Sequence, residues 1–240
     1  MNLQHPEDVR ARWRRLLIWS YLLGLHLVIA VLVFKTDFLS RAQARLSPDR
    51  GSALHPYVAE TLTYHRWQQA SAPVGSLVFI GDSITQGLSA AALGPGALNF
   101  GIGHLDSRQL LKILPDYPAL QQARTIVLTL GINDYVKGLY GGLAGRYRDL
   151  VAALPAQTPL IWNGVMPARH PRIDPAVIRA GNDAIRQLCA ERPNCRYVDT
   201  WSVLADAQGL PIAGYYLDDG VHLNADGYRR WIALLRPLLY

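Results

Sequence analysis

The sequence predicts an α/β domain built on a parallel β-sheet, preceded by one apolar helix. Three observations lead to this expectation. Residues 16–34 contain no charged side chain, short apolar runs alternate with helical segments from residue 56 onwards, and polar, glycine-rich turns follow several of those runs. Such alternation is typical of a parallel sheet that helices cover on both faces.

Composition and charge narrow the class of protein. A chain of 240 residues, half of them hydrophobic, is long enough for one sizeable domain with a core of its own and an appendage. The net charge of +6 is concentrated in two clusters: Arg10, Arg12, Arg14, Arg15 and Lys35, Arg41, Arg45, Arg50. Because both clusters flank the apolar segment, they indicate membrane flanking, and we expect no nucleic-acid partner.

The N-terminal region divides into a basic tail (residues 1–15), a transmembrane helix (16–34) and a polar juxtamembrane linker (35–55). The helix would be about 28 Å long, close to the roughly 30 Å hydrocarbon core of a bilayer. His26 lies in mid-span, either as a functional group or, the reading we favour, as a neutral imidazole. Aromatic residues lie at the arginine-rich end: Trp13, Trp19 and Tyr21. Ser20 and Gly24 have the spacing of a weak self-association face.

The alternatives for this segment are a cleavable signal peptide and a buried soluble helix. We favour an uncleaved single-pass anchor, because the apolar run exceeds the usual signal core. A short basic tail before a long domain favours an inner-membrane orientation with that domain on the periplasmic side. Cys189 and Cys195 would close a small disulfide loop in an oxidising compartment, or remain two buried thiols. Two cysteines without clustered partners predict no metal site.

The domain, residues 56–240, is predicted element by element. Continuous apolar runs indicate strands, and segments with helical spacing that end before Pro115 and Pro155 indicate helices. The expected strands are 77–80, 97–100, 125–130, 160–165 and 196–198. The expected helices are 57–69, 105–114, 143–154, 173–190 and 225–239.

Polar segments follow the strands and would meet at one rim of the sheet. Ser83 follows the first strand near a helix N-terminus, and a serine needs a base to become a nucleophile. His222 is a suitable base, and Asp219, three residues earlier, can orient it. The amide of Asn133 and a glycine-rich segment, residues 99–104, can stabilise an oxyanion. Each segment alone also fits a plain turn or a helix cap, but their joint placement favours catalysis.

Taken together, these segments resemble the sequence blocks of the GDSL/SGNH hydrolases over about residues 75–240. The blocks are Gly81-Asp82-Ser83-Ile84, Gly131-Ile132-Asn133-Asp134 and Asp219-Gly220-Val221-His222. The resemblance implies a three-layer, flavodoxin-like fold with five parallel strands. It also implies that Ser83 is the nucleophile, His222 the base and Asp219 its orienter, with Asn133 and the Ser83 backbone N–H as oxyanion donors.

The second block departs from the family pattern. The pattern Asn-x-Gly-Ile-x-Gly, counted from Asn99, places His104 where the family has a glycine that donates its N–H. The resemblance thus implies a backbone oxyanion donor at His104, or at Gly103 in a shifted register. The His104 imidazole either contacts the substrate, narrowing the acyl pocket, or points to solvent.

These features lead us to expect a membrane-anchored serine esterase without metal or cofactor that deacylates a cell-envelope carbohydrate or lipid ester. Short loops near the site favour a small acyl group, such as acetyl on a glycan. The alternatives are a (lyso)phospholipase or thioesterase, an O-acyltransferase on a glycan, and a catalytically silent envelope-binding module. The sequence leaves the substrate and the oligomeric state open.

Overall fold

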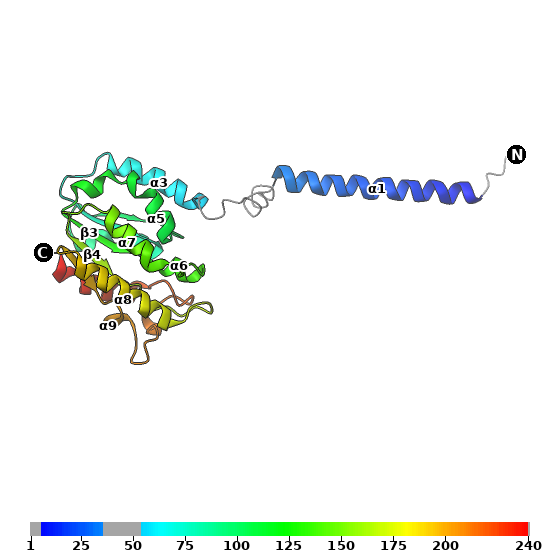
Figure 1. Ribbon diagram of the computed structural model, residues 1–240. Coiled ribbons are helices and arrows are strands. Elements are labelled where there is room, and N and C mark those ends of the chain that lie inside the picture. Colours follow the sequence, from blue (N-terminus) through cyan, green and yellow to red (C-terminus); the bar gives the residue numbers. More distant parts are fainter. Residues whose placement is uncertain (1–5, 36–53, 240) are drawn as a thin grey trace. The chain divides into compact units, whose positions relative to one another are not determined.

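The computed structural model describes residues 6–35 and 54–239 (Figure 1). The chain divides into two units, residues 1–53 and 54–240. Helix α1 (Pro6–Lys35) contains a span, Arg10–Val31, with a mean hydropathy of 1.5, which is long and apolar enough to cross a membrane. A signal sequence has the same properties. Most of the predicted linker, with Arg41, Arg45 and Arg50, lies outside the described residues.

Within α1, the imidazole of His26 has a partner in its own helix. Its Nδ1 donates to the carbonyl of Leu22 at 2.7 Å. The side chain is therefore hydrogen-bonded without any second helix.

The second unit is built on a five-stranded parallel sheet. Its order is β2-β1-β3-β4-β5, and every neighbouring pair is parallel. The strands are β1 (Leu77–Gly81), β2 (Leu98–Gly101), β3 (Thr125–Thr129), β4 (Leu160–Asn163) and β5 (Cys195–Val198). All residues of β1 and β4 are buried, because helices cover both faces of the sheet. The predicted fold class is confirmed.

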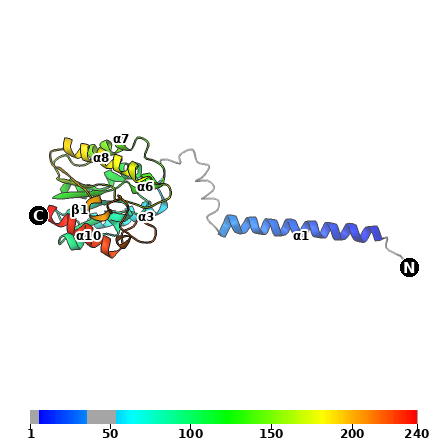
Figure 2. The same cartoon turned by 90° about the horizontal axis from the view of Figure 1, so that it is seen from below.

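Helices form the outer layers. The longer ones are α3 (Pro56–Gln69), α5 (Ser107–Ile113), α7 (Leu143–Ala153), α8 (Pro175–Glu191) and α10 (Ala225–Leu235). Helices α5, α7 and α8 pack side by side, and Figure 2 shows α7 and α8 on one side of the sheet and α10 on the other. The short ones are α4 (Ser83–Gln86), α6 (Ile132–Val136) and α9 (Trp201–Leu204), with 3₁₀ turns at Ala90–Leu93, Leu114–Asp116, Pro118–Gln122, Ala213–Tyr215 and Arg236–Leu238.

Several helix boundaries differ from the sequence prediction for local reasons. Helix α5 begins two residues later than expected, because Asp106 forms a capping box at its start. Helix α8 likewise begins at Pro175, since the Asp174 side chain accepts the N–H of Ala176 at 2.8 Å. The last helix ends its α-helical part at Leu235, before a proline-containing 3₁₀ turn.

Cys189 and Cys195 form a disulfide, which decides between the two expectations for these cysteines. It joins the end of α8 to the start of β5. Within this loop, Arg192 donates hydrogen bonds to the carbonyls of Val151, Pro155 and Thr158, at 3.1, 2.6 and 3.0 Å. The loop is therefore fastened to the last turn of α7 and to the segment that follows it.

Candidate active site

The turn after β1 presents Ser83 at the carboxyl end of the sheet. Asp82 caps α4 by accepting the N–H of Ile84 at 3.0 Å, so Ser83 is the first residue of a short helix. Gly81 is required just before it, because a Cβ there would lie 1.9 Å from the carbonyl oxygen of Thr129. The strand thus delivers a half-buried serine to the rim where parallel sheets place reactive groups.

Asp82 is buried beneath this turn, with 1% of its surface exposed. Burial raises the pKa of Asp82 to about 7, although the N–H groups of Ile84 and Gly131 and the nearby His222 act in the opposite direction. Its carboxyl group caps α4 and faces the Gly131 N–H, which is consistent with a side chain that stabilises the turn.

Ser83, His222 and Asp219 form a continuous chain of hydrogen bonds. Ser83 Oγ lies 2.9 Å from His222 Nε2, and His222 Nδ1 lies 2.6 Å from Asp219 Oδ2. Partial burial acts to raise the pKa of Asp219, but hydrogen bonds from the His222 side chain and from the backbone N–H groups of His222 and Val221 outweigh it and lower that pKa. An ionised Asp219 keeps the proton on Nδ1, so Nε2 faces Ser83 as an acceptor.

The loop between the 3₁₀ turn Ala213–Tyr215 and α10 holds Asp219 and His222 together. Leu217 donates its N–H to the carbonyl of His222 at 2.8 Å, and Asp219 Oδ1 accepts the N–H groups of Val221 and His222, each at 2.9 Å. Gly220 takes a positive φ of 65°, and a Cβ there would lie 2.6 Å from the carbonyl oxygen of Arg169. This turn lets the Asp219 side chain reach the imidazole of His222, three residues later in the sequence.

Asn133 reaches the same rim from the turn after β3. It lies in α6, and its Nδ2 donates one hydrogen to the carbonyl of Leu105 at 3.0 Å. This bond fixes the plane of the amide. The second hydrogen of Nδ2 has no acceptor among the residues that the structure describes.

The second block is shaped by Asn99 and closes at His104. Asn99 accepts the N–H of Gly101 at 2.9 Å, and the N–H of Gly103 donates to Gln86 Oε1 at 2.9 Å. The N–H of His104 has no acceptor within residues 54–239. His104 has a φ of 65°, a left-handed conformation that costs a non-glycine residue roughly 1–2 kcal/mol.

The His104 side chain packs against the start of α3 and the residue before that helix. Its ring stacks on that of His55 with centroids 4.7 Å apart, and Tyr57 meets it edge-on at 6.0 Å. The pKa of His55 is lowered by partial burial and by the charges of His104 and Lys137. The imidazole is therefore a packing partner of the segment that begins the domain.

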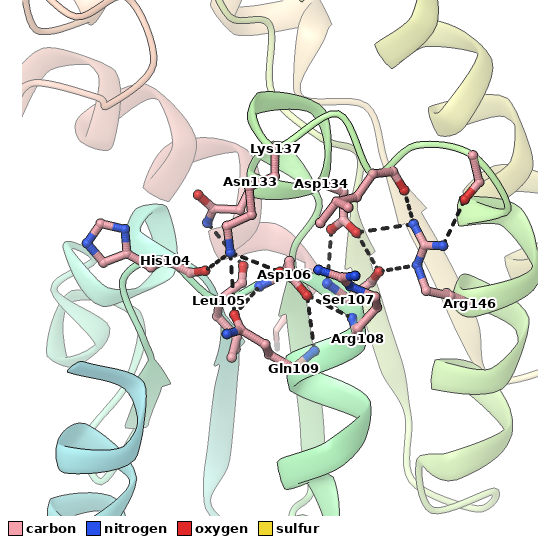
Figure 3. Close-up of polar contacts among 12 residues, drawn as sticks. His104, Leu105, Asp106, Ser107, Arg108, Gln109, Asn133, Asp134, Lys137 and Arg146 are labelled. Atoms are coloured by element: carbon pink, nitrogen blue, oxygen red, sulfur yellow. Dashed lines mark hydrogen bonds and ion pairs between the residues drawn. The ribbon is translucent and has the colours of Figure 1, made fainter. Parts of the chain in front are cut away.

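A polar network lies beside the backbone of His104, and no sequence pattern indicated most of its members. Lys137 Nζ contacts the carbonyl of His104 at 2.7 Å and Asp106 Oδ2 at 2.9 Å (Figure 3). Beside it, Asp134 accepts the N–H and the hydroxyl of Ser107 at 3.0 and 2.6 Å. Burial raises the pKa of Asp134, against the effect of those hydrogen bonds.

Arg146 completes this network, with its Nε donating to Ser107 Oγ at 2.7 Å. The network fastens the start of α5 to α6. Asp134 belongs to a recognisable block, but Ser107 and Arg146 lie in no pattern that local sequence would reveal. Across the described ranges, no group of three or more His, Cys, Asp or Glu side chains is placed to hold a metal ion.

Comparison with known proteins identifies a family whose sequence model this chain matches. Residues 79–230 match the model of the GDSL-like lipase/acylhydrolase family. Among curated proteins, no sequence relative was found.

Solved structures share the fold. One, a protein of Streptococcus pneumonia whose description names platelet activating factor, has a TM-score of 0.69 and 22% identity over 77% of this chain and 93% of its own. A GDSL-like lipase of Bacteroides thetaiotaomicron has a TM-score of 0.59 and 22% identity over 75% and 98%. An acetyl-xylooligosaccharide esterase of Geobacillus stearothermophilus has a TM-score of 0.57 and 19% identity over 69% and 94%.

Proposed function

The chain belongs to the GDSL-like lipase/acylhydrolase family, and is thereby a carboxylic ester hydrolase; we propose that Ser83, His222 and Asp219 are its catalytic triad. The observation that carries this proposal is the chain of contacts at 2.9 and 2.6 Å from Ser83 Oγ through the imidazole to Asp219. Three functionally unrelated side chains would not be expected to form such a chain of contacts.

The reaction follows from the geometry. Ser83 Oγ attacks the ester carbonyl while His222 Nε2 takes its proton, and the carbonyl oxygen becomes an oxyanion. The N–H groups of Ser83 and His104 and the second hydrogen of Asn133 Nδ2 would stabilise that oxygen. The imidazolium then protonates the departing alcohol. Water, deprotonated by His222, releases the acid from the acyl-enzyme and restores Ser83.

Replacing Ser83 with Ala tests the role of the nucleophile. Hydrolysis of p-nitrophenyl acetate by the purified full-length chain should fall at least about a thousandfold, because no covalent intermediate can form. An unchanged rate in the Ser83→Ala chain would exclude Ser83 as the nucleophile.

For the substrate, we propose a small acyl group, such as acetyl, on a cell-envelope carbohydrate. The loops that carry His104, Asn133 and His222 are short, and they leave the triad partly exposed, with 40% of the His222 side chain accessible. Such a site suits a bulky alcohol with a small acid. A series of p-nitrophenyl esters from acetate to laurate, together with acetylated glycans, tests this choice, and a preference for long chains would favour a lipid ester instead.

We propose that helix α1 is an inner-membrane anchor and that the hydrolase domain lies on the periplasmic side. The uncharged span and the aromatic residues at its basic end support this placement. Protease added to intact spheroplasts should remove a C-terminal tag. Digestion only after the membrane is disrupted would reverse the orientation, and a shortened mature chain would show a cleaved signal.

A further inference from the structure

The backbone of His104 has an unusual conformation. It is the only non-glycine residue in the described ranges with a positive φ, and it supplies one proposed oxyanion donor. A non-glycine residue keeps such a conformation only where its surroundings hold it. The neighbour that contacts its backbone is Lys137, whose Nζ lies 2.7 Å from the His104 carbonyl oxygen.

Building on the proposed function, we propose that Lys137 is a positioning residue for ester hydrolysis, which fixes the direction of the His104 N–H by holding the His104 carbonyl. The peptide plane after His104 is fastened at both polar groups. Lys137 holds its carbonyl, and the N–H of Leu105 donates to the carbonyl of Ile102 at 3.3 Å. The His104 N–H belongs to the peptide plane before His104, and the φ of His104 sets the angle between that plane and the one that Lys137 holds. If His104 left the left-handed region, the direction of its N–H relative to the held plane would change.

The ammonium is itself held in place. Asp106 Oδ2 lies 2.9 Å from Lys137 Nζ, and only 2% of the Asp106 side chain is exposed. Burial acts to raise the pKa of Asp106. The hydrogen bond and charge of Lys137, together with the Gln109 N–H and the charge of Arg108, outweigh burial and keep that pKa below its ordinary value. Because Asp106 also caps α5, Lys137 links the His104 carbonyl to a rigid helix start (Figure 3).

The side chain of His104 and the residue before it have contacts of their own. Its imidazole stacks on His55, and the N–H of the preceding Gly103 donates to Gln86. Lys137 is therefore the side chain that acts on the plane following His104, together with the backbone bond of Leu105, while the other contacts act on the His104 side chain and on the residue before it.

A purely structural role for Lys137 would be to support the Asp106 cap, and Arg108 provides the matched control. Arg108 Nη2 also pairs with Asp106 Oδ2, at 3.6 Å, but no contact joins it to His104. In the full-length chain, Lys137→Met should lower kcat for p-nitrophenyl acetate about tenfold, the loss expected for one charged hydrogen bond, with KM changed less than about twofold. Lys137→Arg should recover part of that loss, and Arg108→Met should stay within about twofold of wild type.

The decisive comparison repeats the lysine substitution in a chain that also carries His104→Gly. Glycine adopts a φ of 65° without strain, so the loss caused by Lys137→Met should shrink to below about threefold in that background. An equal loss in both backgrounds, or an equal loss from Arg108→Met, would overturn the positioning role. Unchanged kcat in Lys137→Met would overturn it as well, whereas a wild-type chain without esterase activity would overturn the proposed function itself.

Discussion

A single carboxylate, that of Asp219, links the shape of the loop that carries His222 to the proposed chemistry. One oxygen accepts two backbone N–H groups and the other accepts the imidazole N–H of His222. The same charge thus closes the loop and sets the tautomer of His222, the proposed base. At this scale the contacts of Ser83 with His222 and of His222 with Asp219 were predictable from the chemistry that a serine nucleophile would require.

Asp219→Asn should therefore lower kcat far more than the loss of one exposed charge would. The amide would offer an N–H to Nδ1, favour the wrong tautomer and lower kcat by about 10³–10⁴-fold. Asp218→Asn is the matched control, since the neighbouring exposed carboxylate makes the same change of charge next to the loop. Comparable losses in the two variants, measured with p-nitrophenyl acetate, would contradict the role given to Asp219.

At the scale of elements, α3 shows how the segment that begins the domain is docked. His65 is 5% exposed, and its Nδ1 lies 2.9 Å from the hydroxyl of Tyr117. Burial lowers the pKa of His65 to about 4. The same helix carries Tyr57, which reaches His104, so the docking of α3 bears on the wall of the site.

His65 should make the stability depend on pH. Its folded pKa lies below its unfolded value of about 6.5, so its contribution is complete above pH 6.5 and is lost as the pH falls from 6.5 towards 4. His65→Asn keeps a partner for Tyr117 without the titration. Urea unfolding between pH 7 and 4 should show a steeper loss in wild type, by up to about 1.4 kcal/mol per pH unit. Parallel curves for the two chains would contradict this account.

The Cys189–Cys195 disulfide should stabilise the junction of α8 with β5 modestly, because its loop is short. Chain-entropy reasoning gives about 2 kcal/mol, so the Cys189→Ser, Cys195→Ser double variant should unfold at lower urea concentration. Reducing the wild-type chain should reproduce that shift. An identical midpoint for the reduced and oxidised chains would show that the bond adds no stability.

At the scale of the whole molecule, the fold was predictable because its signals are local. Five apolar runs and the turns that follow them sufficed for the sheet and for the meeting of Ser83, Asn133 and His222 at one rim. The supporting contacts were not predictable, since Lys137 reaches His104 and Arg146 reaches Ser107 only through the packing of α5, α6 and α7. The left-handed conformation of His104 is also uncommon for a non-glycine residue, and no sequence pattern predicted it.

The central claim is that Ser83 is the residue that becomes acylated. The most direct measurement is to treat the full-length chain with a fluorophosphonate and to locate the adduct by mass spectrometry of its peptides. The account predicts one adduct per chain, on Ser83, and its loss in the Ser83→Ala variant. An adduct on another residue, or equal labelling of the Ser83→Ala chain, would contradict it.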